Sequence, residues 1–118
     1  MRYLPILFAV IVLNASPAPA AELPPAVARA NECSLKLADR YSAMTTEPAE
    51  TIATAAIAGC EDKWQLILNE ADRQRFGAEA VQAYIIESEQ LAKTYLVRAV
   101  IEMRLIRLQH GRPPAAAQ

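Results

Sequence analysis

The two cysteines are the sequence feature that most constrains the fold. The chain has 118 residues, and Cys33 and Cys60 lie at equal distances from the point between Thr46 and Glu47. A proline follows at Pro48, and the threonine, the acid and the proline together are typical of the start of a helix. A chain that reverses direction here brings both cysteines to the same level. The spacing therefore predicts a helical hairpin closed by a Cys33–Cys60 disulfide.

The first 20 residues have the three parts of a secretory signal peptide. A short basic start precedes an apolar run over residues 3–13, and an A-x-A pattern ends at Ala20. We expect cleavage between Ala20 and Ala21, followed by export to the periplasm or out of the cell. The alternative is a membrane anchor, but the run is shorter than the about 20 apolar residues that span a bilayer. Export also provides the oxidising surroundings in which a disulfide persists.

The remainder of the chain is typical of an all-α protein. Alanine, the strongest helix former, occurs 24 times and glycine three times. We expect residues 21–112 to form one small three-helix domain, in which a disulfide-closed hairpin packs against a long C-terminal helix. The first helix is predicted over residues 25–43 and the last over residues 78–110. Residues 113–118 are expected to be a disordered tail.

Apolar residues recur at steps of three and four in each predicted helix, which indicates a core-facing stripe. The first stripe contains Ala26, Ala30, Cys33, Leu37, Tyr41 and Met44. The second stripe contains Ile52, Ala56, Cys60, Trp64, Ile67 and Ala71, with a turn predicted over residues 73–77. The third contains Val81, Tyr84, Ile85, Ser88, Ala92, Tyr95, Leu96, Ala99, Met103 and Ile106. Gly59 either allows close approach of two backbones or is tolerated at a cost of about 1 kcal/mol.

The last helix carries a second apolar face on its opposite side. At 1.5 Å per residue it reaches about 48 Å, whereas the first helix reaches about 29 Å and cannot cover it from end to end. The candidate interface on that face consists of Val97, Ile101, Leu105 and Leu108. Burial against a second copy or another protein is expected to cover these side chains.

Charge is distributed unevenly along the chain. Residues 21–92 contain six basic and twelve acidic side chains, a formal charge of −6, whereas residues 93–118 contain five basic and one acidic, a charge of +4. The candidate basic patch consists of Lys93, Arg98, Arg104, Arg107 and Arg112. These side chains either stabilise the negative end of the helix dipole or bind an acidic partner or an anionic membrane.

No pattern in the sequence predicts catalysis or a cofactor. The single histidine, His110, has no cysteine or carboxylate at a ligand spacing, so we assign no metal. Carboxylate pairs such as Glu87 and Glu89 are interpreted as solvated helix faces, with Glu89 and Lys93 at the favoured i,i+4 spacing. A slightly acidic mature chain does not fit nucleic-acid binding.

Two functions follow from these patterns. The first is an exported, non-enzymatic interaction module that binds itself or another protein through the C-terminal helix. The alternative is a peripheral envelope protein whose basic, amphipathic C-terminal helix lies on an anionic membrane.

Overall fold

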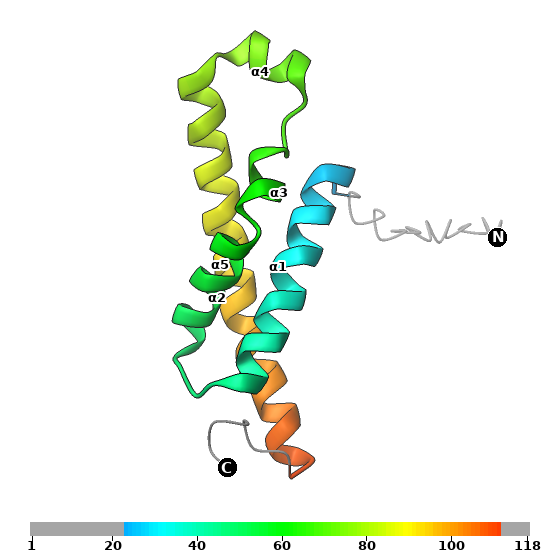
Figure 1. The fold of residues 1–118 in the computed structure, drawn as a ribbon, viewed down its shortest axis with the longest axis vertical. Helices are drawn as coiled ribbons and strands as arrows, with labels where there is room; N and C mark the ends of the chain where they lie inside the picture. Colours follow the sequence, from blue (N-terminus) through cyan, green and yellow to red (C-terminus); the bar gives the residue numbers. More distant parts are fainter. Residues whose placement is uncertain (1–22, 112–118) are drawn as a thin grey trace, which may run out of the picture.

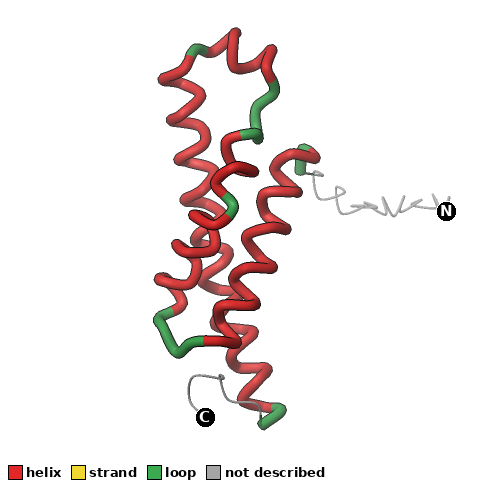
Figure 2. Tube along the Cα trace, in the orientation of Figure 1, coloured by secondary structure: helices red, strands yellow, loops and turns green. Residues whose placement is uncertain are grey.

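The computed structural model describes residues 23–111, which fold entirely into helices and connecting turns (Figure 2). The helices are α1 (Pro25–Met44), α2 (Ala49–Gly59), α3 (Glu61–Gln65), α4 (Glu70–Phe76) and α5 (Ala78–Gln109). This confirms the predicted all-α class and the bounds of the first and last helices to within one residue. The predicted signal peptide with its cleavage site at Ala20 and Ala21, Arg112 and the predicted tail lie outside the described residues.

Three helices, α1, α2 and α5, contact one another and form a bundle. α1 descends in Figure 1, α2 returns beside it, and α5 packs against both while running in the same direction as α1. The 20 residues of α1 span about 30 Å and the 32 residues of α5 about 48 Å. The C-terminal end of α5 therefore continues past the α1–α2 turn, and its N-terminal end reaches α4 (Figure 1). The hairpin covers α5 only along its middle, as the lengths predict.

The second helix is not continuous, which corrects the sequence prediction. α2 ends at Gly59, a one-residue break at Cys60 separates it from α3, and a turn over residues 66–69 precedes α4. Asn69 stabilises the start of α4, because its side-chain oxygen accepts a hydrogen bond from the backbone N–H of Asp72 at 2.8 Å. Residues 73–76, predicted as a turn, are consequently helical, and the chain reverses at Gly77, where φ is +80°.

The buried face of α1 is displaced by one residue from the predicted stripe. Four small side chains spaced by four residues are fully buried there: Ala30, Ser34, Ala38 and Ser42. The larger side chains expected at the centre, Cys33, Leu37 and Tyr41, are half-buried beside them, and Met44 is exposed. Small side chains occupy the line of closest approach because they allow neighbouring helix axes to come together.

The disulfide joins α1 to the α2–α3 break. The sulfur atoms of Cys33 and Cys60 lie 2.12 Å apart and the Cα atoms 6.0 Å apart, which confirms the predicted pair. Gly59 lies next to this link, and a Cβ atom there would approach Leu37 Cδ1 to 2.6 Å. The absence of a side chain at Gly59 thus makes room for the side chain of Leu37, not for the backbone of the neighbouring helix.

The core side of α5 is displaced from the predicted stripe and includes Val100, which that stripe did not contain. Its buried residues are Val81, Ile85, Ala92, Leu96 and Val100. Tyr84, Tyr95 and Ile106, predicted on the same stripe, are 45%, 60% and 54% exposed. The core therefore lies to one side of the predicted stripe, because α1 and α2 contact α5 along only part of its circumference.

Candidate functional site

The C-terminal end of α5, residues 101–109, presents much of its apolar surface to solvent. Ile101, Leu105 and Leu108 are 48%, 53% and 64% exposed, so three of the four candidate interface residues lie on the surface. Val97, the fourth, is half-buried and packs against the core, which removes it from the exposed face. The neighbouring Ile106 adds to the exposed apolar surface of this end.

Most residues of the candidate basic patch form ion pairs or hydrogen bonds with other residues of the domain. The Lys93 ammonium forms an ion pair with Glu50, whose carboxylate oxygen lies 3.2 Å away. The i,i+4 spacing had indicated Glu89 as its partner. Arg104 donates a hydrogen bond of 3.1 Å to the carbonyl oxygen of Thr45, at the end of α1. Of the four patch residues within 23–111, Arg98 is the one that lies exposed on α5 without a hydrogen bond or ion pair to another described residue.

Arg107 attaches the lower part of α5 to α1. Its guanidinium lies 2.7 Å from a carboxylate oxygen of Asp39, donates to the Asp39 carbonyl oxygen at 3.1 Å, and donates to Ser42 Oγ at 2.7 Å. Three contacts to one helix orient this side chain inward. Arg107 therefore attaches α5 to α1, a role that neither sequence alternative, the helix dipole or an anionic partner, included.

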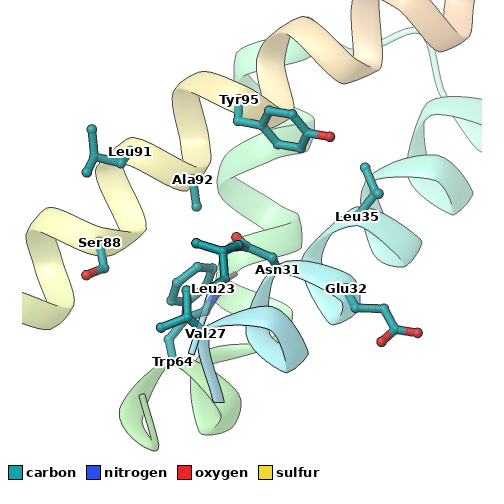
Figure 3. A pocket seen from close by; sticks show the side chains of 10 residues that line it. All are labelled: Leu23, Val27, Asn31, Glu32, Leu35, Trp64, Ser88, Leu91, Ala92 and Tyr95. Carbon is teal, nitrogen blue, oxygen red and sulfur yellow. The ribbon is translucent and has the colours of Figure 1, made fainter. Parts of the chain in front are cut away.

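A second surface is an apolar groove between α1 and α5. Its volume is about 600 Å³. Figure 3 shows the side chains that line it. Its walls are formed by Leu23, which precedes α1, by Val27, Asn31, Glu32 and Leu35 from α1, by Trp64 from α3, and by Ser88, Leu91, Ala92 and Tyr95 from α5. The Glu32 side chain extends away from α5 and pairs with Lys36 at 3.0 Å. The groove itself is therefore lined mainly by carbon.

Trp64 forms the buried wall of this groove. Its side chain is 1% exposed, and its indole N–H donates a hydrogen bond of 3.0 Å to Ser34 Oγ within the core. Four residues earlier in the chain, Cys60 links the same region to α1. The position of the indole is thus held by packing, by one hydrogen bond and by the nearby disulfide.

A pair of carboxyl groups lies between α3 and α5. Oε1 of Glu89 is buried and has no hydrogen-bond partner within residues 23–111. Burial, and then hydrogen bonding to and repulsion by Glu61, raise the pKa of Glu89 from an ordinary value of 4.5 to about 7. Glu61 also accepts a hydrogen bond of 2.7 Å from Gln65 on α3. Near neutral pH the two helices are therefore held together better when Glu89 is protonated.

Replacing Glu89 with glutamine is expected to remove a pH dependence of stability. Because the pKa of Glu89 is higher in the folded chain, its stabilising effect is complete below pH 4.5 and is lost as the pH rises through about 7. Glu89→Gln keeps a donor for Glu61 without the charge, so it should raise the free energy of unfolding at pH 8 by about 1 kcal/mol and change it little at pH 4.5. Urea unfolding at both pH values measures this. The control is Glu87→Gln, on the exposed side of α5, and an equal gain for both variants would contradict the assignment.

Sequence reasoning missed the groove. Its apolar residues come from three helices, and Leu91 and Tyr95 are separated from Val27 by more than sixty positions. The periodicity of α5 predicts Tyr95 in the core, because a stripe on one helix does not show how much of it the neighbouring helices cover. The exposed Leu91, which belongs to no predicted stripe, is the one signal in the sequence that could have indicated a further surface.

The fold defines a small, disulfide-linked helical domain with two exposed apolar surfaces. Within residues 23–111 no three metal-ligating side chains come together, and no helix in that range is long and apolar enough to cross a bilayer. The chain matches no protein-family model, no curated protein sequence and no solved structure.

Proposed function

We propose that the protein is an exported, non-enzymatic interaction module that associates through α5, in the first place with a second copy of itself. The observation that carries this proposal is the exposure of Ile101, Leu105 and Leu108 at the end of a helix that continues past its own hairpin (Figure 1). Full burial of each such side chain is worth about 1.5 to 3 kcal/mol. A twofold pair needs only one self-complementary patch to obtain that stabilisation.

Two further observations support this proposal. Lys93, Arg104 and Arg107 bind groups of their own domain, which leaves a smaller cationic surface for the alternative function on an anionic membrane. The Cys33–Cys60 disulfide and the A-x-A pattern that ends at Ala20 fit a site of action outside the cytoplasm. The membrane function thus becomes the second outcome of the test below.

Ile101→Glu together with Leu108→Glu is expected to convert a dimer into a monomer while the helical circular dichroism is largely kept. The reason is that two buried, unpaired carboxylates on each chain would oppose association, whereas in the monomer both side chains are already in solvent. Light scattering coupled to size exclusion measures the mass. Leu66→Glu with Phe76→Glu is the matched control, because these side chains are 66% and 54% exposed but lie outside α5.

Three results would argue against the proposal. If the α5 variant unfolds, its two side chains belong to the domain's own core. If the control dissociates to the same extent, the loss reflects any added negative charge and not the α5 surface. If the wild-type protein is monomeric and sediments with anionic vesicles in a salt-sensitive way, the membrane function replaces the proposed one.

A further inference from the structure

One stripe of α5 passes through the groove and continues to the C-terminal end of the helix. Tyr84, Leu91, Arg98 and Leu105 recur every seven residues, and Ser88, Tyr95, Glu102 and Gln109 follow each of them by four. At 100° per residue all eight lie within about 100° of arc, beside the core face and not on it. Seven of them are exposed and Ser88 is half-buried in the groove. Helices pair side by side along a seven-residue repeat of apolar residues, and four of these eight are apolar or aromatic: Tyr84, Leu91, Tyr95 and Leu105.

The charges on this stripe favour an antiparallel pair. Residues 78–92 of α5 contain three acids and no base, a charge of −3, whereas residues 93–109 contain four bases and one acid, a charge of +3. A parallel pair would place Arg98 against Arg98 and Glu102 against Glu102. An antiparallel pair centred at residue 100 instead places Arg98 against Glu102 of the second copy, twice by symmetry.

The same register also matches the apolar residues. Residues 95 and 105 have their midpoint at residue 100, so Leu105 of one copy meets Tyr95 at the edge of the other copy's groove. Leu105 and Tyr95 are 53% and 60% exposed in the single chain. Ile101 and Ile106 flank Leu105 on opposite sides, and Ile106, on the same side of α5 as Ser88, can extend the contact toward the groove wall that α1 forms (Figure 3). Both apolar surfaces of the domain would then be buried by one interface.

We infer that the groove between α1 and α5 receives the C-terminal end of α5 from a second copy, in an antiparallel pair centred at residue 100 with Arg98 bound to Glu102 of its partner. This inference rests on the proposed self-association and specifies its geometry. Neither Arg98 nor Glu102 has a hydrogen bond or ion pair to another residue within 23–111, so both are available for the second copy.

Charge reversal tests the register. Arg98→Glu alone and Glu102→Arg alone each create two like-charge contacts, so the dimer dissociation constant should rise by about 10-fold or more. The double variant, Arg98→Glu with Glu102→Arg, restores opposite charges and should return the constant to within about threefold of wild type. Analytical ultracentrifugation gives the constants, and circular dichroism shows that each variant is folded. Single variants without effect, or a double variant that stays monomeric, would overturn this register.

A substitution in the groove tests the docking surface separately. Leu91 is 70% exposed, so Leu91→Glu should fold normally and raise the dissociation constant by about 10-fold or more, whereas Leu66→Glu, 66% exposed and outside the stripe, should not. An unchanged constant for Leu91→Glu would overturn the groove as the docking site. If Ile101→Glu with Leu108→Glu dissociates the dimer while Leu91→Glu and the charge reversals do not, this inference fails and the proposed self-association stands.

Discussion

Removing the disulfide is expected to lower the free energy of unfolding by about 3 to 4 kcal/mol. The bond closes a loop with a sequence separation of 27 residues, and its loss gives the unfolded chain the freedom that the loop now restricts. That loss is a large share of the stability of a domain this small. In the folded chain it would also release α1 from the break between α2 and α3. Reduction should therefore open the hairpin at the level of Cys33.

Alanine is the appropriate replacement for this test. Cys60 is 0% exposed, so a serine hydroxyl there would be buried among apolar groups. Urea unfolding of Cys33→Ala with Cys60→Ala is compared with wild type, each with and without reductant. Wild type should lose its extra stability on reduction, and the double variant should not respond to reductant. A wild-type midpoint that reductant leaves unchanged would show that the bond does not stabilise the domain.

Trp64→Ala is expected to be the most destabilising single substitution in the core, at about 3 to 5 kcal/mol. The indole is the largest fully buried side chain and is enclosed by α1, α3 and α5. Its removal leaves a cavity that small neighbours such as Ala30 and Ser34 cannot fill. The loss also removes the inner wall of the groove, so the dimer dissociation constant should rise together with the loss of stability.

Two milder variants separate the volume of Trp64 from its hydrogen bond. Trp64→Phe keeps an aromatic ring but leaves less volume filled, and Ser34→Ala leaves the indole N–H buried without its acceptor at 3.0 Å. An unpaired buried donor costs about 1 to 3 kcal/mol, so Ser34→Ala should be clearly destabilising despite its small change in size. Urea unfolding followed by circular dichroism measures all three variants. If Ser34→Ala is as stable as wild type, the hydrogen bond has no net effect on folding.

Helix positions could be predicted from the sequence because they depend on local signals. Pro25 at the first turn, Gly77 before α5 and the alanine-rich composition between them need no information about the neighbours. The interruption at Cys60 was not predictable in this way. The apolar stripe continues through it to Ile67, which is also buried, so the periodicity gives no sign that the helix stops and restarts.

The two candidate surfaces differ in how far the sequence could define them. The exposed end of α5 could be predicted, because α5 is longer than the hairpin helices and carries apolar residues on the side away from its core stripe. Ile101, Leu105 and Leu108 could be identified in this way. The inward contacts of Arg107 could not, because Asp39 lies 68 positions away in the chain. The raised pKa of Glu89 likewise depends on Glu61, which belongs to another helix.

The sequence by itself determined that this chain is helical, that Cys33 pairs with Cys60, and that α5 is too long for its hairpin to cover. These properties depend on residue type, spacing and length along one chain. Only the tertiary structure decided which side of each helix is buried. α1 contacts both α2 and α5, so its buried line runs between them through Ala38 and Ser42, where only small side chains fit. The periodicity of apolar residues shows that a helix has a buried face. The positions of the neighbouring helices decide which side of the helix that face is on.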